Sequence, residues 1–301
     1  MKEEFASLIA LRGDTQIKKG EGLAKYSTFK IGGNARYAIF PENKNALVFA
    51  VTACREFGIP YRIIGCASNV LFDDGGFSGA VIFTKWVNKT EREGNIFRAE
   101  CGLPLSALCI LAKNLSLSGL EFAFGIPGSV GGAVYMNAGA YGGEIKDVLC
   151  EAEYFDAESG VIKTAPAQSL GLGYRKSVFQ HSQYIILSAS FSLKNGNITE
   201  IERKMSENMA ARREKQPIEY PSAGSAFKRP EGYFAAKLID DAGLRGLSHG
   251  GAQVSEKHAG FIINRGGATS ADVMALTEEI REKVSDRFGV LLETEFVHIK
   301  D

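Results

Sequence analysis

The sequence has 301 residues, 45% hydrophobic and 23% charged, and its 35 Lys and Arg balance 35 Asp and Glu. This composition is typical of a globular protein long enough for two or more domains. A net charge of zero lacks the basic excess of a general nucleic-acid binder. No apolar run approaches the roughly 20 residues that a membrane helix needs, and the N-terminal stretch is a poor signal peptide. We therefore expect a cytoplasmic protein that binds neither nucleic acid nor a membrane.

The first two thirds of the chain alternate predicted helices and strands. Residues 45–60 predict a helix, because apolar residues recur on one face and Gly58 and Pro60 end it. An apolar helix is predicted at 104–119, opened by a proline and closed by a glycine. Strands are predicted at 61–65, 79–86, 95–101, 150–156 and 184–193.

The pattern becomes more charged after residue 195. Helices are predicted at 199–217, 232–246 and 270–289, and strands at 258–267 and 290–299. In the last helix Val273, Leu276, Ile280 and Val284 form one apolar stripe. The order of elements indicates a mixed α+β fold with a boundary near 195–220.

The five cysteines, at positions 54, 66, 101, 109 and 150, show no metal-site or disulfide pattern. Their number is odd, and no CxxC or Cys/His pair has the spacing of zinc ligands. We expect no metal centre and no structural disulfide, with Cys54, Cys109 and Cys150 as small buried hydrophobic residues.

Segment 125–144, GIPGSVGGAVYMNAGAYGGE, is rich in glycine but also carries Tyr135, Met136 and Tyr141, unlike a flexible linker. Glycine permits positive φ and close backbone approach, and exposed N–H groups can bind phosphate oxygens. The alternative is a set of tight turns between strands. The segment, called the glycine block below, matches neither the P-loop nor the G-x-G-x-x-G pattern. A dinucleotide bound here would therefore require a fold other than the standard Rossmann domain.

A second loop, 63–77, follows a predicted strand and presents Gly65, Ser68 and Asn69. Small residues with short donors after a strand again suit phosphate. Two such loops predict one long ligand with a pyrophosphate in its middle.

Several longer motifs carry a family resemblance. They are TFKIGG (28–33), GCASNVLF (65–72), the glycine block, YRKSVF (174–179), YPSAGSAFKRP (220–230), GGAQVSEKHAGFIINRG (250–266) and LETEF (292–296). Together they resemble the UDP-N-acetylenolpyruvoylglucosamine reductase family over nearly the whole chain, in the family's order. The short chain, in which YRKSVFQHSQYIIL runs almost directly into a strand, resembles the type that lacks the extra loop and folding unit.

The resemblance implies a flavoenzyme of peptidoglycan precursor synthesis, with UDP-N-acetylmuramate dehydrogenase activity. NADPH would deliver hydride to non-covalently bound FAD, whose N5 would pass it to the enolpyruvyl group of UDP-N-acetylglucosamine enolpyruvate, giving UDP-N-acetylmuramate. The implied fold is α+β: a vanillyl-alcohol-oxidase-like FAD-binding domain in two α+β lobes, plus a smaller C-terminal α+β substrate domain. We expect the lobes at 1–85 and 86–196 and the substrate domain at 197–289, with strand 290–301 able to return to the first lobe.

The resemblance also implies three catalytic residues, and each has a plainer reading. Ser225, in AGSAF, matches the family's proton donor, although a serine in such a setting is ordinarily a turn or cap residue. Arg175, in YRKS, matches the active-site arginine, where most arginines form surface salt bridges. Glu295, in LETE, matches the catalytic glutamate; Glu293 has the same strand parity and is its rival.

The ligand-binding residues are also inferred from the family motifs. For FAD they are Gly65, Cys66, Ala67, Ser68, Asn69, Val70, Gly125, Ile126, Pro127, Gly128, Ser129, Gly132, Ala133, Asn137, Gly139 and Ala140. For the substrate they are Tyr174, Arg212, Lys215, Lys228 and Arg229. Arg229 stands where the family often has Asn, and Cys66 and Ala67 stand where it often has glycines.

Two other functions stay open from the sequence. A related FAD-dependent alcohol oxidase or dehydrogenase on the same fold is the first, and a catalytically silent nucleotide-sugar binder is the second. Retention of Arg175, Ser225 and Glu295 together favours the reductase. The sequence leaves the oligomeric state open and is compatible with a monomer.

Overall fold

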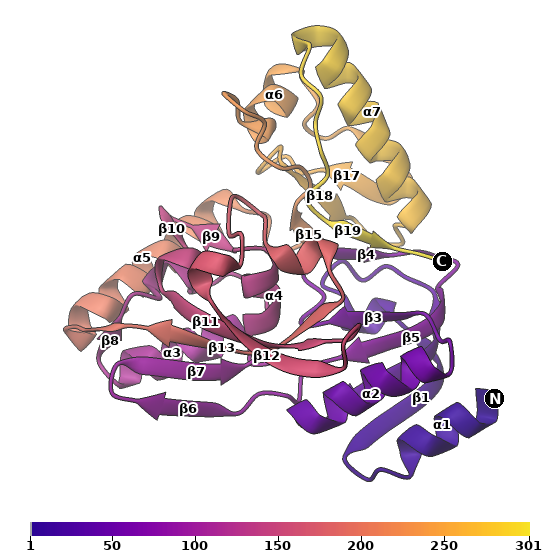
Figure 1. The fold of residues 1–301 in the computed structure, drawn as a ribbon. Helices are drawn as coiled ribbons and strands as arrows, with labels where there is room; N and C mark the ends of the chain where they lie inside the picture. Colours follow the sequence, from indigo (N-terminus) through magenta and orange to yellow (C-terminus); the bar gives the residue numbers. More distant parts are fainter. Residues whose placement is uncertain (1) are drawn as a thin grey trace. The chain divides into compact units, whose positions relative to one another are not determined.

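The computed structural model describes residues 2–301, which fall into two compact units, each built from separate stretches of chain (Figure 1). Unit 1 comprises the chain up to Lys19, Tyr37–Cys66 and Gly79–Ala211. Unit 2 comprises Gly20–Arg36, Ala67–Ser78 and Arg212–Asp301. The chain therefore passes repeatedly from one unit to the other, and the domain limits expected near 85 and 196 stay a prediction.

Helices are interspersed with runs of strands along the chain, as Figure 1 shows. The α-helices are α1 (Lys2–Ala10), α2 (Lys44–Glu56), α3 (Leu105–Asn114), α4 (Val130–Tyr135), α5 (Ile198–Lys215), α6 (Ala235–Asp241) and α7 (Ser270–Phe288). The first strands are β1 (Thr15–Gly22), β2 (Asn34–Pro41), β3 (Tyr61–Ile64), β4 (Val70–Phe72), β5 (Phe77–Phe83), β6 (Thr90–Glu93), β7 (Ile96–Glu100), β8 (Leu117–Ser118), β9 (Gly139–Ala140) and β10 (Gly143–Glu144). The later strands are β11 (Leu149–Asp156), β12 (Val161–Pro166), β13 (Tyr184–Ser192), β14 (Lys194–Asn195), β15 (Ser222–Ser225), β16 (Ser248–His249), β17 (Ala252–Val254), β18 (Phe261–Asn264) and β19 (Val297–Ile299).

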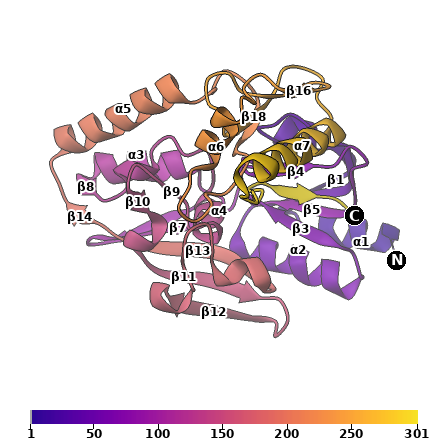
Figure 2. The ribbon, with the colours of Figure 1, turned by 90° about the horizontal axis from the view of Figure 1, so that it is seen from above.

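Unit 1 is built mainly on two sheets. A five-stranded antiparallel sheet has the order β12-β11-β13-β7-β6, and Figure 2 shows β12, β11, β13 and β7 side by side. A second sheet, of order β1-β2-β5-β3, lies mostly in unit 1 and includes the parallel pair β3 and β5. Strand β13 is central in the first sheet, so its apolar run is buried almost throughout.

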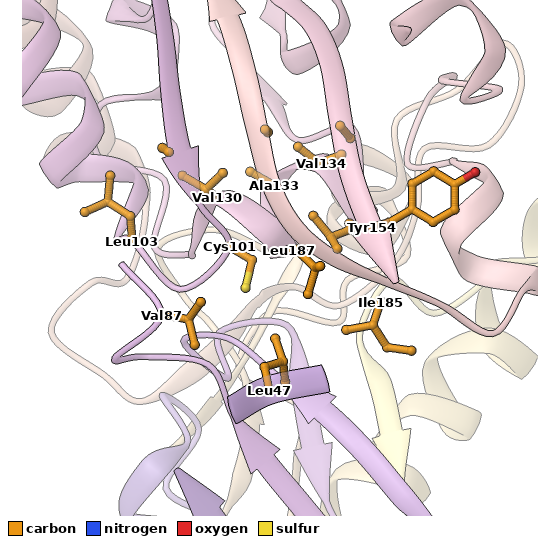
Figure 3. Packing of buried hydrophobic residues seen from close by; sticks show 14 of the residues in the cluster. Leu47, Val87, Cys101, Leu103, Val130, Ala133, Val134, Tyr154, Ile185 and Leu187 are labelled. Atoms are coloured by element: carbon orange, nitrogen blue, oxygen red, sulfur yellow. The ribbon is translucent and has the colours of Figure 1, made fainter. Parts of the chain in front are cut away.

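The core of unit 1 includes part of the glycine block. Val130, Ala133 and Val134 of α4 are at most 3% exposed, and they pack in the same cluster as Leu103 and Leu187 (Figure 3). The block thus has an apolar face that is held by the core, which a flexible linker would lack.

Unit 2 has its own core, beneath α7 and the antiparallel sheet β15-β18-β17-β16. The predicted stripe Val273, Leu276, Ile280 and Val284 is confirmed, since each of these side chains is 0% exposed. The Thr269 capping box begins α7, and Gly289, at φ 68°, ends it. Strand β19 pairs in parallel with β4 at the other end of the sequence.

Several predicted elements are shorter than expected. The predicted helix 104–119 ends at Asn114, because Ser116 takes a left-handed φ of 54°. The predicted helix 232–246 forms only over Ala235–Asp241, and the predicted strand 290–299 only over Val297–Ile299. Helices α1 and α4 and strands β1, β2 and β12 lie where no element was predicted.

All five cysteines are free thiols. Burial raises the pKa of Cys54 and of Cys109 to about 12, in keeping with the expected apolar role. The expectation was wrong for Cys150, which lies in β11 and is only half-buried.

Candidate active site

Two loops that the sequence predicts for one ligand lie against each other in unit 1. A Cβ placed on Gly65 would lie 2.1 Å from the Ser129 Oγ, so this approach requires a glycine. Ser129 is the N-cap of α4, and its Oγ accepts a hydrogen bond from the Gly132 N–H at 3.2 Å. The loop after β3 and the start of the glycine block therefore share one small region of unit 1.

The second half of the glycine block is a tight hairpin. Strands β9 and β10 pair Gly139 with Glu144, and Tyr141 and Gly142 between them have φ values of 51° and 83°. Positive φ at both central residues is the mark of a type I′ turn. The alternative considered from the sequence, a tight turn between strands, therefore holds for this half of the block.

Three glycines of the block are required by the chain's own packing. A Cβ on Gly131, Gly139 or Gly143 would come within 3.0 Å of Cys101, of the 143–144 backbone or of the Phe122 ring, respectively. Gly132 differs, because a Cβ there would meet only the Ser129 Oγ at 3.5 Å, an ordinary contact. Packing within the described chain therefore does not explain the glycine at position 132.

The donors at this place fit the pyrophosphate of FAD. Among residues 2–301, the backbone N–H groups of Gly65, Gly128 and Ser129 make no hydrogen bond. Phosphate oxygens bind well to such unused N–H groups in small-residue loops. Gly65, Gly128 and Ser129 could therefore hold the pyrophosphate, with Gly132 leaving room beside it.

The other candidate FAD residues divide between the two units. In unit 1, Ala133 is a core residue of α4, Ile126 donates its N–H to the Ala123 carbonyl, and Asn137 is 0% exposed. The remaining unit 1 candidates are Cys66, Gly125, Pro127, Gly139 and Ala140, and those of unit 2 are Ala67, Ser68, Asn69 and Val70. Ala67 has a left-handed φ of 50°, and burial raises the pKa of the Cys66 thiol.

Arg175 lies at the tip of a short turn in unit 1. Gly173 and Lys176 close this turn with two backbone hydrogen bonds of 3.1 Å, and Arg175 takes a φ of 52°. Its Nη2 donates to the Gly139 carbonyl at 3.3 Å, and its guanidinium lies 5.0 Å from the centre of the Tyr174 ring. The positive side chain is thus held against the hairpin of the glycine block.

Ser225 and Glu295 belong to backbone segments of unit 2 that meet next to Ser225. Ser225 is the last residue of β15, and the next residue, Ala226, accepts a hydrogen bond from the Glu295 N–H at 2.9 Å. Asn69 adds a further contact, since its Nδ2 donates to the Glu295 carbonyl at 3.1 Å. Within the predicted strand 290–299, Thr294 forms only an isolated β-bridge, with Phe227.

The rival carboxylate, Glu293, is in a different setting. Its side chain is 75% exposed and pairs with Lys228 at 3.2 Å, while its carbonyl accepts the Lys228 N–H at 2.8 Å. Glu293 therefore forms a surface ion pair, and the choice of Glu295 over Glu293 stays a prediction.

The candidate substrate residues are spread over both units. Tyr174, in unit 1, is 41% exposed. Arg212 and Lys215 lie in the last turn of α5, and the Arg229 guanidinium lies 5.0 Å from the centre of the Phe234 ring. Next to Lys215, the buried Gln216 Oε1 finds no donor among the described residues, and a ligand donor would satisfy it.

Sequence reasoning missed residues that support the site through the backbone. Thr28 Oγ1 donates to the Ser222 carbonyl at 2.7 Å and so holds the start of β15. Gln180 donates to the Arg175 carbonyl at 3.0 Å. Thr28 lies in the motif TFKIGG, and Gln180 directly follows the motif YRKSVF. Their nearness to family motifs is the one sequence signal that marks them.

The described residues contain neither a metal-binding cluster nor a membrane-spanning helix. Over residues 2–301 no three His, Cys, Asp or Glu side chains are placed to hold a metal ion. Within the same range no helix has the length and apolar character needed to cross a membrane.

Comparison with known proteins agrees with this geometry. Residues 35–165 match a family model described as an FAD binding domain, and residues 216–299 match the C-terminal domain of UDP-N-acetylenolpyruvoylglucosamine reductase. A UDP-N-acetylenolpyruvoylglucosamine reductase of Clostridium botulinum is 48% identical over 94% of this chain and 92% of its own. The crystal structure of the same reductase from Thermus caldophilus is 35% identical, with a TM-score of 0.80 over 95% of this chain and 99% of that one.

A structure of berberine bridge enzyme shares the fold alone: it is 15% identical, with a TM-score of 0.50 over 64% of this chain and 43% of that one. The fold is thus α+β, with a vanillyl-alcohol-oxidase-like FAD-binding part and a C-terminal α+β part, and it defines an FAD-dependent oxidoreductase. Within that class, the chain belongs to the UDP-N-acetylenolpyruvoylglucosamine reductase family. The predicted resemblance and the predicted cofactor FAD are confirmed.

Proposed function

We propose that this protein uses NADPH and FAD to reduce the enolpyruvyl group of UDP-N-acetylglucosamine enolpyruvate to the lactyl ether of UDP-N-acetylmuramate. The proposal includes a cytoplasmic location and a role in peptidoglycan precursor synthesis. When bound, FAD would supply the hydride chemistry, taking hydride from NADPH and giving it to the substrate from N5. Family membership and the backbone hydrogen bond between Glu295 and Ala226, the residue after Ser225, support the proposal.

Each of the three candidate residues has a defined task in this reaction. Hydride addition to one alkene carbon builds negative charge on the other carbon and on the carboxylate. A proton donor and a fixed positive charge lower the energy of that state. Ser225 would give the proton, Glu295 would complete the acid relay or polarise the substrate carboxylate, and Arg175 would bind the carboxylate through its guanidinium.

The observation that carries the assignment is the hydrogen bond from the Glu295 N–H to the Ala226 carbonyl at 2.9 Å. It joins the backbone of the proposed acidic residue to that of the residue after the proposed proton donor. A serine hydroxyl is a weak acid, so it needs such a partner close by.

The deciding experiment separates the two half-reactions of Ser225→Ala. Flavin reduction by NADPH is followed anaerobically, and enolpyruvyl substrate is then added to the reduced enzyme. We expect normal reduction and near-normal substrate binding, but reoxidation slowed about 10²–10⁴-fold, the usual contribution of a general acid. The matched control is Ser222→Ala, whose hydroxyl only accepts the Gly224 N–H at 3.4 Å and which should reoxidise normally.

Other outcomes would overturn parts of the proposal. Normal reoxidation of Ser225→Ala would remove Ser225 as proton donor. If the unmodified enzyme were reoxidised by oxygen but not by the enolpyruvyl substrate, an oxidase would replace the reductase. If purified protein contained no flavin and took up none, the FAD assignment itself would fail.

A further inference from the structure

Arg175 has a backbone conformation that it would not adopt unaided. Its φ of 52° lies in the left-handed region, where an L-residue with a Cβ is strained. It occupies the third position of the Gly173–Lys176 turn, a place where positive φ ordinarily favours Gly or Asn. Surrounding contacts must therefore hold this arginine in place.

Gln180 supplies a side-chain contact to the backbone of Arg175. Its side-chain Nε2 donates to the Arg175 carbonyl at 3.0 Å and to the Tyr135 carbonyl, also at 3.0 Å. Tyr135 is the last residue of α4, where helix carbonyls lack an intrahelical partner. One amide group thus ties the backbone of the arginine to the end of the helix in the glycine block.

Neighbouring contacts fix the base of the turn but do not reach Arg175. Buried Asn137 donates from Nδ2 to the Gly173 carbonyl at 2.9 Å, and Ser177 Oγ donates to the Tyr135 carbonyl at 2.6 Å. These bonds place the turn as a whole. Gln180 alone among the side chains of these bonds meets the carbonyl of the residue whose φ is strained.

We propose that Gln180 is a positioning residue: its amide holds Arg175 in the left-handed conformation and so sets where the guanidinium meets the substrate. The inference rests on the proposed role of Arg175 in the reductase reaction. A rotation of the Arg175 backbone would move the guanidinium at the end of its long side chain by far more than the backbone itself. Small displacements of a positioned charge are costly to rate.

The test compares two variants. Gln180→Met keeps the length of the side chain but loses the N–H donor, and Gln180→Glu keeps the shape of the side chain but places a carboxylate against the two carbonyls. Both should slow flavin reoxidation by the enolpyruvyl substrate about 10- to 100-fold. Flavin reduction by NADPH and FAD content should change little. Calorimetric titration of substrate onto the oxidised enzyme should show weaker binding in both. Gln183→Met is the matched control, since Gln183 contacts the Tyr61 hydroxyl instead, and it should behave as the unmodified enzyme.

A double-mutant cycle separates positioning from general support of the fold. If Gln180 acts through Arg175, Gln180→Met should cause no further loss of rate in an Arg175→Ala background. Equal losses in both backgrounds would overturn the inference. If Gln180→Met does not fold, Gln180→Asn, whose amide is one methylene short of the carbonyls, takes its place in the cycle.

Failure of the inference differs from failure of the proposed function. A slow Arg175→Ala enzyme together with a normal Gln180→Met enzyme would overturn the positioning role and leave the role of Arg175 intact. A normal Arg175→Ala enzyme would overturn the proposed role of Arg175 itself.

Discussion

The individual glycines of the glycine block are required for different physical reasons. Gly131 must be glycine because a Cβ would lie 2.9 Å from the Cys101 Cβ, whereas a Cβ on Gly132 meets no close neighbour. The chain thus requires the first glycine for its own packing. Its packing gives no such reason for the second, and we propose that bound FAD requires this glycine.

Gly132→Ala should therefore separate protein stability from cofactor affinity. Alanine in place of glycine within a helix favours the helix by about 0.5–1 kcal/mol, so the apoprotein should be as stable or slightly more stable in urea. FAD affinity should fall by about tenfold or more, equivalent to ~1.4 kcal/mol, in a flavin fluorescence titration. The comparison is Gly131→Ala, which should lower stability first. Unchanged FAD affinity in Gly132→Ala would show that no ligand needs the space.

The candidate catalytic residues could be proposed from the sequence only where a motif carried them. Ser225, Arg175 and Glu295 each stand inside a family motif, whereas the rival Glu293 is an exposed partner of Lys228. Gln180 acts through its side-chain amide on a backbone carbonyl. No sequence pattern marks such a contact, because it depends on a left-handed φ five residues earlier.

Among the elements, α7 is anchored at its start by two aspartates that follow β4. Asp74 accepts the N–H groups of Ser270 and Ala271 at 2.9 and 3.2 Å, and thus stabilises the helix N-terminus. Asp73 Oδ2 lies 3.0 Å from His298 Nε2 in β19. This pair of residues joins three elements of unit 2.

The interactions of Asp73 should make the free energy of unfolding decrease at acid pH. The N–H of Gly75, and after it His298, hold the pKa of Asp73 below its usual value, against a smaller opposing effect of burial. A carboxyl group whose pKa is lowered in the folded state stabilises that state fully above the unfolded pKa of about 3.9. This stabilisation is lost as the pH falls through the folded-state pKa. In urea unfolding, Asp73→Asn should be less stable than the unmodified protein at pH 7, and the gap should narrow toward pH 3. Asp286→Asn, at an exposed position of α7, should show no such gap.

Periodic elements were the easiest to predict. The stripe of α7 appears in the sequence because one face is buried along the whole helix. Helix α4 was missed because its six residues include two glycines, which disfavour a helix, and its stability comes from the core contacts of Val130, Ala133 and Val134. Tertiary packing of this kind is not visible in local sequence.

At the scale of the whole molecule, neither unit is a continuous stretch of chain. The core of unit 2 includes Phe29, Ile31 and Leu71, which are at most 2% exposed, although most of that unit follows residue 211. A C-terminal fragment would therefore lack part of its own core.

The fragment 212–301 should not fold by itself. Loss of a large core side chain costs about 2–5 kcal/mol. Three such losses together remove most or all of the ~5–15 kcal/mol that stabilises a typical domain. Circular dichroism and protease digestion of the purified fragment would measure this, beside the full chain as control. A cooperative thermal transition in the fragment would contradict the expectation. The same measurement on 197–289 would test the substrate domain predicted from the sequence.

The pairing of β4 with β19 also has a consequence for how the protein is made. Residues 70–72 leave the ribosome early, but their partners, 297–299, are nearly the last to be translated. The segment that follows Cys66 therefore stays without its partner strand, and with part of its apolar surface exposed, until translation ends. Synthesis that stops a few codons early would leave β4 without its partner, so such chains are expected substrates for chaperones and proteases.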